Sequence, residues 1–452
     1  MRIHLIAIGG SAMHNLAIAL HSNHHSVTGS DDEIYNPAKE RLAKHGLLPQ
    51  KMGWDEARIK ADIDVVILGM HARKDNPELK KAKKLGLKIM SYPEYLYQHS
   101  KDKNRVVVAG SHGKTTTTSM IMHVLKYLKV DYDYMVGAQL EGFDTMVRLS
   151  DAPLMVIEGD EYLSSPIDRR PKFLHYKPDL AVITGVAWDH INVFPTFKNY
   201  VAQFDLFLKT MRKGGQVFYY KHDKVLKKLA KNYKGKATLF AYEVFDFDIA
   251  SGKTSLRADD GKTHQLSIFG KHNLENLKAA YLVCKELGIE DKYFFKAIKT
   301  FKGAAKRLQL LYKKNGCVAY LDFAHAPSKV TATVAALKSK QAKQKLVACL
   351  ELHTFSSLNR KFLKEYSGSM AGADKAMVYF SEHTLKMKKL PLLSTEEVSA
   401  AFNHPNIEVF TDNQKLLKAL NRFKWKDKQL LMMSSGTFNG LDLKKEAKRL
   451  LN

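Results

Sequence analysis

Residues 106–120 read VVVAGSHGKTTTTSM, and this stretch decides the fold that we expect. The apolar residues Val106–Ala109 predict a buried parallel strand, which a glycine-containing turn joins to a helix beginning near Lys114. Backbone N–H groups of such a turn point inward, and the positive end of the helix adds to them, so the turn can bind phosphate. The order strand, Gly-x-x-Gly-Lys-Thr, helix therefore predicts a nucleotide-binding P-loop rather than an ordinary turn with a solvated lysine.

The P-loop prediction gives the residues of the turn specific roles. Lys114 is expected to reach the β- and γ-phosphates of a nucleotide, and the Thr115 hydroxyl is expected to bind Mg²⁺. The turn is one or two residues shorter than the general P-loop pattern, although its order of elements is kept. The residues expected to contact the nucleotide here are Gly110, Ser111, His112, Gly113, Lys114, Thr115 and Thr116.

Length and composition describe a multidomain globular protein. The chain has 452 residues, too many for one hydrophobic core, and it is 45% hydrophobic and 26% charged. Neither a signal peptide nor an apolar run of membrane-spanning length is visible, so we expect a cytoplasmic protein without membrane insertion. The three scattered cysteines form no metal-type pair, which fits a reducing compartment.

The formal net charge of +26 raises the possibility of a nucleic-acid partner. The lysines are spread along the chain, however, and their modest clusters lack the interleaved aromatic residues of a stacking platform. A basic surface also attracts small polyanionic substrates by electrostatic steering. A basic nucleic-acid-binding P-loop NTPase is therefore the less favoured alternative, and we expect no nucleic-acid partner.

The first hundred residues alternate strand-like and helix-like segments, which is typical of a Rossmann-like nucleotide-binding domain. Gly9, Gly10 and Ser11 follow the first strand and would admit a diphosphate to a helix N-terminus, although the flanking glycines of a dinucleotide fingerprint are missing. Asp31 ends the second strand, where it would receive a ribose hydroxyl or cap the next turn. The polar stretch Lys101–Arg105 is expected to be a linker.

Two later strands carry polar residues at their ends. The strand Leu154–Ile157 ends in Glu158, and a carboxylate beside a phosphate-binding turn suits Mg²⁺, which takes oxygen ligands. The strand Leu180–Ile183 leads to His190, which is either a structural histidine or a second metal ligand. We therefore expect Thr115, Glu158 and His190 to be the metal ligands.

Further motifs follow in the second half of the chain. Asn273 and Asn276 lie three residues apart at the start of an expected helix, so they share one face and could read an adenine edge, or act as an N-cap and a surface residue. A third region alternates strands and helices again. Its strand Val318–Leu321 ends in Asp322 and leads to His325, at the edge where α/β sheets bind ligands.

Six ordered motifs resemble those of the Mur ligases, which are ATP-dependent ligases of peptidoglycan synthesis. The motifs are GSHGKTTT, EGDE, the strand-end pair Asp189-His190, GKHNLEN, KRL and DFAHAP, and they extend over the whole chain. The blocks IHLIAIGGSAM, ARKDNPE and PKFLHYKPDLAVI are similar to the murein peptide ligase branch of that family. The muramate–alanine ligase branch is the nearest alternative.

The resemblance implies an α/β fold with three domains. Residues 1–102 would form a Rossmann-like domain that binds the UDP-sugar, with Gly9, Gly10, Ser11 and Asp31 as contacts. Residues 103–302 would form the central P-loop domain that binds ATP. Residues 303–452 would form a Rossmann-like domain that closes over ATP and the acceptor.

The resemblance also implies roles for single residues. Lys114, Arg307 and His325 would be catalytic, with Arg307 brought to the γ-phosphate by the third domain and His325 near the reacting carbonyl or the incoming amine. Asn273 and Asn276 would contact adenine, and Asp322 the ribose.

In the implied reaction, ATP with Mg²⁺ phosphorylates the carboxylate of UDP-N-acetylmuramate. The amine of the murein tripeptide L-alanyl-γ-D-glutamyl-meso-diaminopimelate then attacks the acyl phosphate. L-Alanine is the alternative acceptor, because the segment Glu351–Asn359, where relatives carry acceptor-binding residues, matches neither branch well. The sequence does not predict the oligomeric state.

Overall fold

The structure is a computed structural model that describes residues 1–250, 253–259, 261–303, 307–314 and 316–452. Asp260, in the sequence Asp259-Asp260-Gly261 that predicts a turn, and Lys306 of the KRL motif lie outside these residues. The described chain forms two compact units. The first consists of Met1–Val186, Val201–Tyr242 and Ala279–Glu290, and the second of Ala187–Tyr200, Glu243–Lys278 and Asp291–Asn452.

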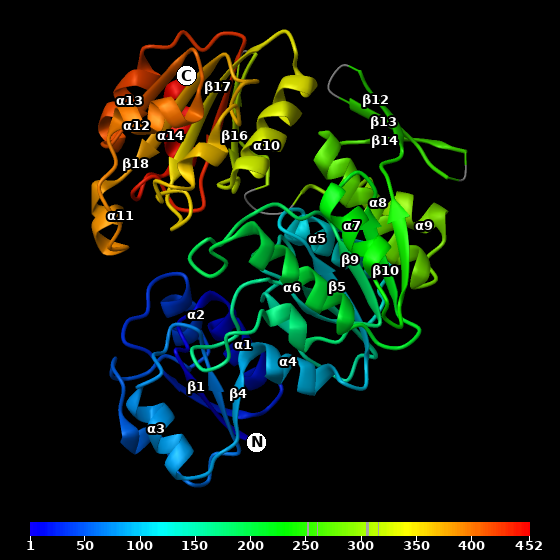
Figure 1. Cartoon of the computed structure of the whole chain (residues 1–452), viewed down its shortest axis with the longest axis vertical. Helices are drawn as coiled ribbons and strands as arrows, with labels where there is room; N and C mark the ends of the chain where they lie inside the picture. Colours follow the sequence, from blue (N-terminus) through cyan, green and yellow to red (C-terminus); the bar gives the residue numbers. More distant parts are fainter. Residues whose placement is uncertain (251–252, 260, 304–306, 315) are drawn as a thin grey trace. The chain divides into compact units, whose positions relative to one another are not determined.

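The N-terminal sheet, drawn in blue in Figure 1, has four parallel strands in the order β2-β1-β3-β4. Its strands are β1 (Arg2–Ile6), β2 (Ser26–Ser30), β3 (Val65–Leu68) and β4 (Ile89–Ser91). The helical segments between and after them are α1 (Ser11–Ser22), α2 (Ala38–Lys44), the short 3₁₀ helix η1 (Glu56–Arg58), α3 (Pro77–Lys84) and α4 (Tyr92–Ser100). Because every strand pairs in parallel, each crossover passes through a helical or irregular segment, as in a Rossmann-like domain.

The central sheet has seven strands in the order β11-β10-β9-β5-β8-β6-β7, and β7 alone among them pairs antiparallel. Its strands are β5 (Asn104–Ala109), β6 (Asp133–Met135), β7 (Val147–Arg148), β8 (Leu154–Glu158), β9 (Leu180–Ile183), β10 (Gln216–Tyr220) and β11 (Thr238–Tyr242). Its helices are α5 (Lys114–Tyr127), the 3₁₀ helix η2 (Lys172–His175), α6 (Phe197–Lys209) and α7 (Lys224–Asn232). The strand carrying the P-loop, β5, lies between β8 and β9, so three strand ends meet at one edge.

A small antiparallel sheet follows, in the order β12-β13-β14. Its strands are β12 (Asp246–Ala250), β13 (Lys253–Arg257) and β14 (Thr263–Leu266), and the helices after it are α8 (Lys271–Glu286) and α9 (Asp291–Ile298). The ring of Phe295 on α9 stacks on His264 of β14 at 3.9 Å between centroids. This contact packs the helix onto the sheet.

The C-terminal sheet has six strands in the order β15-β16-β20-β17-β18-β19, parallel except for β15. Its strands are β15 (Gln309–Lys314), β16 (Cys317–Asp322), β17 (Lys345–Leu352), β18 (Lys375–Phe380), β19 (Ile407–Phe410) and β20 (Lys428–Met433). Its helical segments are α10 (Pro327–Lys340), the 3₁₀ helix η3 (Leu363–Tyr366), α11 (Glu382–Met387), α12 (Thr395–Phe402), α13 (Asn413–Asn421) and α14 (Leu443–Leu451).

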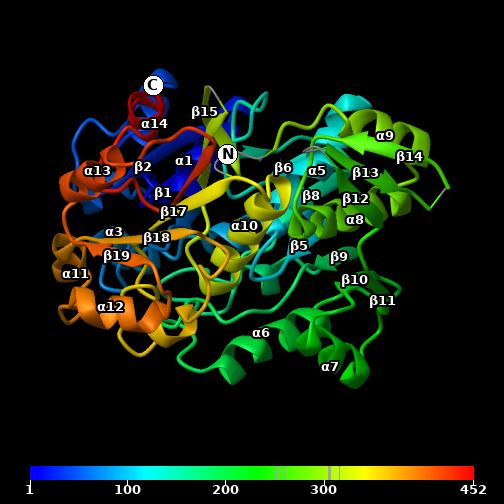
Figure 2. The ribbon, with the colours of Figure 1, turned by 90° about the horizontal axis from the view of Figure 1, so that it is seen from above.

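Both faces of this sheet are buried, because its side chains alternate between two hydrophobic clusters. Leu350 and Val378 pack with α10 and α12, whereas Cys349 and Met377 pack with α13 and α14. Figure 2 shows α13 and α14 on one side of β17 and β18 and α12 on the other. A parallel sheet covered on both faces is the doubly wound architecture expected from the sequence.

The predicted α/β fold is confirmed, and one local prediction is wrong in part. Lys101–Arg105 is a linker only in its first three residues, which connect α4 to β5, because β5 already begins at Asn104 and the Arg105 side chain is buried. Its guanidinium donates to several backbone carbonyls, among them that of Ser100, at 2.5 Å, and that of Lys177, at 3.0 Å. A polar stretch can therefore be interior when a buried arginine satisfies carbonyl groups that water cannot reach.

Candidate active site

The P-loop has the geometry that its sequence predicts. Gly110 and Gly113 both adopt positive φ angles, +130° and +76°, which favour glycine over residues with a side chain. A Cβ atom on Gly110 would lie 2.3 Å from Thr184 Oγ1, so no side chain fits at that position. Gly113 is the N-cap residue of α5 and has no side-chain cap, which leaves the first backbone N–H groups of the helix to face a ligand.

Lys114 lies at the start of α5 and turns back over the loop. Its Nζ donates to Gly110 O, at 2.6 Å, and to Glu161 Oε2, at 2.7 Å. Burial alone would lower the pKa of Lys114, but the carboxylates of Glu161, Asp160 and Glu158 outweigh it and raise that pKa above its ordinary value. Lys114 is therefore a fixed positive charge beside the phosphate-binding turn.

Thr115 and Glu158 come together as the sequence predicts. The Thr115 hydroxyl donates to Glu158 Oε1, at 2.8 Å, and Gly137 N donates to Glu158 Oε2, at 2.7 Å. The strand register places Glu158 beside Val108, two residues before Gly110. A hydroxyl and a carboxylate next to a phosphate cradle are the hard oxygen donors that Mg²⁺ prefers, so these residues fit that ion.

A cavity of about 360 Å³ lies in the first unit next to Glu158. Its lining combines the N-terminus of α1 with the loop after β8. The polar and glycine residues around it are Gly10, Ser11, His71, Gly137, Glu158, Asp160, Ser164 and Lys172, and the apolar ones include Met13, Met70, Tyr92 and Met146. Convergent polar groups in an apolar hollow are typical of a small-molecule site.

The four predicted sugar-nucleotide contacts separate into two pairs. Gly10 and Ser11 line the cavity, whereas Gly9 and Asp31 bond to each other, with Gly9 N donating to Asp31 Oδ2 at 2.7 Å. Burial, together with the neighbouring Asp32, raises the pKa of Asp31 to about 6. Asp31 thus holds the turn after β1, and its predicted contact with a ribose hydroxyl remains a prediction.

In the second unit, Asp189 is the buried centre of a charged cluster. Lys329 Nζ lies 3.2 Å and His325 Nε2 3.9 Å from Asp189 Oδ2, while His190 N donates to Asp189 Oδ1 at 2.8 Å. Burial alone would raise the pKa of Asp189, but Lys329 and the histidines hold that pKa well below its ordinary value.

The predicted metal ligands Glu158 and His190 belong to different units, so a metal site that they share remains a prediction.

The predicted catalytic His325 is buried in this cluster. Its Nδ1 lies 2.8 Å from Phe323 O, so that nitrogen carries the proton and Nε2 faces Asp189. Burial and the nearby Lys329 lower the pKa of His325 to about 3. A neutral imidazole of this kind can accept a proton or orient a partner.

Arg307 precedes Leu308 in the chain, and the side chain of Asp322 bonds to the backbone of Leu308. The Arg307 guanidinium stands 4.8 Å from the centroid of the Phe323 ring. Asp322 accepts hydrogen bonds from the backbone N–H groups of Leu308, at 2.7 Å, and Ala324, at 2.8 Å. One Asp322 oxygen therefore holds the backbone just before β15 and the other the backbone just after β16, and the predicted ribose contact remains a prediction.

The two asparagines lie near the start of α8, as expected. Asn273 Nδ2 donates to Phe269 O at 3.0 Å, and Asn276 is buried. Asn273 lies inside α8, which begins at Lys271, so it is not the N-cap residue, and the buried Asn276 is not a surface residue. The predicted adenine contact of this pair remains a prediction.

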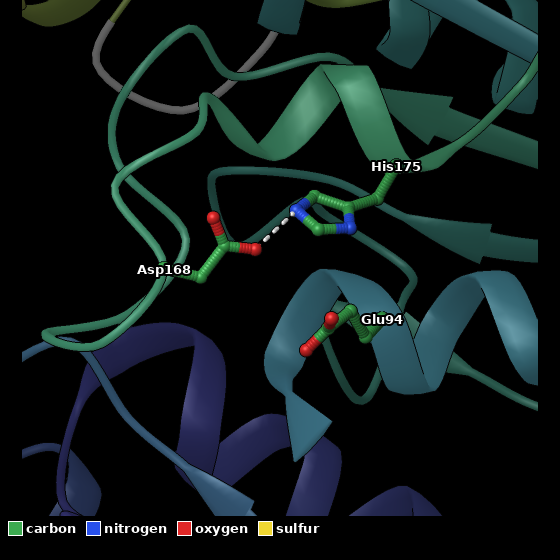
Figure 3. A group of neighbouring side chains, drawn as sticks. All are labelled: Glu94, Asp168 and His175. Carbon is green, nitrogen blue, oxygen red and sulfur yellow. Dashed lines mark ion pairs between the residues drawn. The ribbon is translucent and has the colours of Figure 1, made fainter.

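One further cluster joins Glu94 of α4 to the loop before η2 (Figure 3). His175 Nε2 lies 3.2 Å from Asp168 Oδ2 without hydrogen-bond geometry, and burial lowers the pKa of His175. Arg170 donates to both Asp168 oxygens, with its nearest nitrogen at 2.7 Å, and stands 3.8 Å from Glu94. The Arg170 guanidinium thus already supplies the positive charge that the carboxylates of Asp168 and Glu94 need.

Sequence reasoning missed three charged residues of these sites. Glu161 belongs to the same EGDE motif as Glu158, which was the available signal for its contact with Lys114. Lys172 lies in the block PKFLHYKPDLAVI, which was its available signal, whereas Lys329 gave none, because it is one of 72 Lys and Arg residues and lies 140 residues from Asp189.

No helix in the part of the chain that the structure describes is long and apolar enough to cross a bilayer. Three family models match consecutive segments. They are described as the Mur ligase family catalytic domain over residues 2–104, the Mur ligase middle domain over residues 108–284, and the Mur ligase glutamate ligase domain over residues 306–436.

Two kinds of relative are similar to the chain. A UDP-N-acetylmuramate–L-alanine ligase of Caldicellulosiruptor saccharolyticus is 33% identical over 390 residues, which cover 83% of this chain and 82% of that protein. A UDP-N-acetylmuramate–L-alanyl-γ-D-glutamyl-meso-2,6-diaminoheptandioate ligase of Escherichia coli is 27% identical over 455 residues, which cover 98% and 97%. The crystal structure of a murein peptide ligase from Psychrobacter arcticus has the same fold, with a TM-score of 0.70, 23% identity, and coverage of 100% and 99%.

Proposed function

Since the chain belongs to the Mur ligase family, whose members are ATP-dependent ligases that form amide bonds, we propose that it joins UDP-N-acetylmuramate to the tripeptide L-Ala-γ-D-Glu-meso-diaminopimelate. The observation that carries the ATP-dependent step is the P-loop, in which Lys114 and the Thr115–Glu158 pair surround a glycine cradle. The reaction would return cell-wall peptide to the sugar-nucleotide pool. We propose that it takes place in the cytoplasm, where ATP is available.

In the proposed reaction, the carboxylate of UDP-N-acetylmuramate attacks the γ-phosphorus of ATP and releases ADP. A carboxylate is a poor electrophile, and its acyl phosphate gives the carbonyl carbon a leaving group. Phosphoryl transfer needs charge neutralisation more than covalent help, and Lys114, the α5 N-terminus and Arg307 supply it. Mg²⁺, held by Thr115 and Glu158, would neutralise further phosphate charge, and we propose His190 as the ligand of a second ion.

The tripeptide amine then attacks the carbonyl carbon, and the tetrahedral intermediate expels inorganic phosphate. An amine must lose a proton as the amide bond forms. We assign the orientation of the amine or the acceptance of that proton to His325, because its imidazole is neutral and its Nε2 faces away from the backbone contact.

We propose the tripeptide rather than L-alanine as the acceptor. The support is the similarity to the Escherichia coli peptide ligase over nearly the full length of both chains, whereas the more identical L-alanine ligase aligns over 83% of this chain. The blocks ARKDNPE and PKFLHY add to this, since they lie away from the ATP motifs.

We further propose a role in substrate binding or catalysis for each of three segments of the chain. Residues 1–102 would bind the UDP-sugar through Gly9, Gly10, Ser11 and Asp31. Residues 103–302 would bind ATP through the P-loop, with Asn273 and Asn276 at adenine. Residues 303–452 would supply Arg307, the ribose contact Asp322 and His325. In support, the N-terminal, central and C-terminal sheets each fall within one of these segments.

The test measures phosphate release from ATP with UDP-N-acetylmuramate and either the tripeptide or L-alanine. We expect a higher specificity constant for the tripeptide than for L-alanine. The corresponding difference in transition-state free energy should be at least ~2 kcal/mol, the scale of several added polar contacts. A preference for L-alanine would reject the acceptor and keep the ligase mechanism. ATP hydrolysis that DNA stimulates, with no ligation, would favour the nucleic-acid alternative instead.

A further inference from the structure

The cavity beside Glu158 has an uneven distribution of charge. Glu158 and Asp160 contribute two carboxylates, and Lys172 is its one lysine or arginine among the described residues. The proposed sugar nucleotide is itself an anion, with a diphosphate and a carboxylate. An anionic ligand needs positive charge at each of these groups, since a buried charge without a partner is costly.

Two parts of the cavity lining suit different groups of such a ligand. Gly10 and Ser11 bring the N-terminus of α1 to the cavity, which favours the diphosphate. Glu158 also lines the cavity, and it accepts a hydrogen bond from Thr115 of the P-loop. The group that must lie next to the γ-phosphate of ATP is the carboxylate that receives it.

Lys172 lines the same cavity, is tied to Asp160 close in sequence to Glu158, and keeps donors for a ligand. Its Nζ donates to Asp160 Oδ2 at 2.5 Å, and Asp160 is two residues beyond Glu158. A lysine ammonium has three donors, and no other hydrogen bond of Nζ is found among the described residues. The Tyr162 ring, 5.8 Å from Nζ, covers one side of the ammonium group. Two donors therefore remain available in the cavity.

The backbone that carries Lys172 is fixed on both sides. Lys172 N donates to Tyr162 O at 2.9 Å, and Leu163 pairs with Pro171 in an antiparallel bridge. Asp168 accepts a hydrogen bond from Arg170 and forms an ion pair with His175, the second of which Figure 3 shows, and these contacts hold the loop between Leu163 and Pro171. A side chain on a fixed backbone loses less conformational entropy when it binds a ligand.

We propose that Lys172 binds the carboxylate of UDP-N-acetylmuramate and makes the cavity selective for sugar nucleotides that carry this group. The inference rests on the proposed function and adds a specificity-determining residue to it. Lys172 would hold the carboxylate oxygens toward the γ-phosphate while Asp160 keeps the ammonium in place. The muramate carboxylate would thus be recognised before it is activated.

The test compares two ligands that differ in this carboxylate. Isothermal titration calorimetry at one ionic strength gives the dissociation constants of UDP-N-acetylmuramate and of UDP-N-acetylglucosamine, which lacks the lactyl ether. We expect the wild type to prefer the muramate, and Lys172→Met to reduce that preference roughly tenfold or more, as expected for a charge-assisted hydrogen bond. Lys172→Arg should keep most of the preference.

Two further variants separate ligand binding from structural roles. Arg169→Met removes a positive charge from the same exposed loop and should leave the preference unchanged. The double variant Lys172→Met/Asp160→Asn removes both charges of the ion pair, so it should fold as the wild type does and still lack the preference. If it regains the preference, Lys172 only neutralises Asp160 and the inference is wrong.

The remaining outcomes also decide the inference. Equal weakening of both ligands by Lys172→Met would place the lysine at the diphosphate and overturn it. An unchanged preference in a variant of a working ligase would overturn the inference and leave the proposed function standing. If the wild type neither binds nor ligates UDP-N-acetylmuramate, the proposed function itself fails.

Discussion

At the scale of single residues, the P-loop is arranged around one lysine. Glu161 and the Gly110 carbonyl hold Lys114 over the turn, so its charge is in place before a phosphate arrives. A preorganised charge stabilises a transition state more than a mobile one, because no reorganisation is needed during the reaction. The two glycines with positive φ angles let the backbone N–H groups converge on the same place.

Lys114→Ala should abolish ligation, with a loss in kcat on the order of a hundredfold or more, because it removes charge from the phosphoryl-transfer transition state. Lys126→Ala on the same helix is the control, since the exposed Lys126 Nζ contacts the Gly142 carbonyl away from the turn. Lys114→Ala/Glu161→Gln also removes the partner carboxylate and should be equally inactive while unfolding near the wild-type temperature. Near-normal turnover in either Lys114 variant would end the P-loop assignment.

Arg307→Ala should lower turnover far more than ATP affinity, because we expect this guanidinium to stabilise charge in the transition state. In the structure Arg307 stands over the Phe323 ring, a contact that Arg307→Lys would keep in part. Steady-state kinetics and equilibrium binding of an ATP analogue give the two quantities. A fall in ATP affinity as large as the fall in rate would make Arg307 a ground-state ligand instead.

At the scale of secondary-structure elements, strand ends and helix starts place the charged side chains. β8 and β9 flank β5, so Glu158 and Thr184 come to the P-loop from neighbouring strands. In the second unit, α10 begins at Pro327, after His325, and presents Lys329 in its first turn. That lysine lies against the buried Asp189, which makes α10 part of an electrostatic contact as well as of the hydrophobic packing.

Lys329→Met should lower the free energy of unfolding by about 2 kcal/mol, because it leaves the buried Asp189 without its closest positive partner. Lys338→Met on the same helix removes a half-exposed ion pair with Asp374 and should cost about 0.5 kcal/mol. Urea unfolding followed by tryptophan fluorescence measures both. Equal losses would mean that the Asp189 pair contributes no more than a surface pair.

The pH dependence of this difference follows from the pKa of Asp189. The folded protein holds that pKa below its ordinary value, so the pair stabilises the protein above the unfolded-state pKa and loses its effect as pH falls. The gap between the two variants should therefore be complete at neutral pH and shrink on acidification below about pH 4.

At the scale of the whole molecule, the net charge of +26 has a consequence for substrates rather than for the fold. ATP, the sugar nucleotide and the tripeptide are all anions. A basic protein raises their local concentration and speeds their encounter, and dissolved salt screens that attraction.

Raising ionic strength from about 0.02 M to about 0.2 M should therefore lower kcat/KM for the tripeptide, since the Debye length shrinks over this range. A tripeptide with its diaminopimelate carboxylates amidated loses two negative charges, so it is the matched control and should show no such decrease. Steady-state kinetics at saturating ATP and UDP-N-acetylmuramate measure both slopes. Equal slopes would show that charge steering does not act on the acceptor.

The sequence by itself determined the features that a short run of residues encodes. Backbone dihedral preferences and apolar runs act over a few residues, so the P-loop, the strand Leu180–Ile183 and the helix beginning at Lys114 could be predicted, and with them the α/β fold. Glu158 could also be predicted as a metal ligand candidate, because it ends a strand that belongs in the same sheet as the P-loop strand.

Only the tertiary structure decided which distant side chains meet. Arg105 looks like part of a polar linker, yet carbonyl groups as far along the chain as Lys177 draw it into the interior. Lys329 pairs with Asp189, 140 residues earlier in the chain, through helix packing that no local pattern records. Asp31 and Asp322, predicted at ribose groups, bond to backbone N–H groups, because a buried carboxylate takes the donors that the fold brings to it.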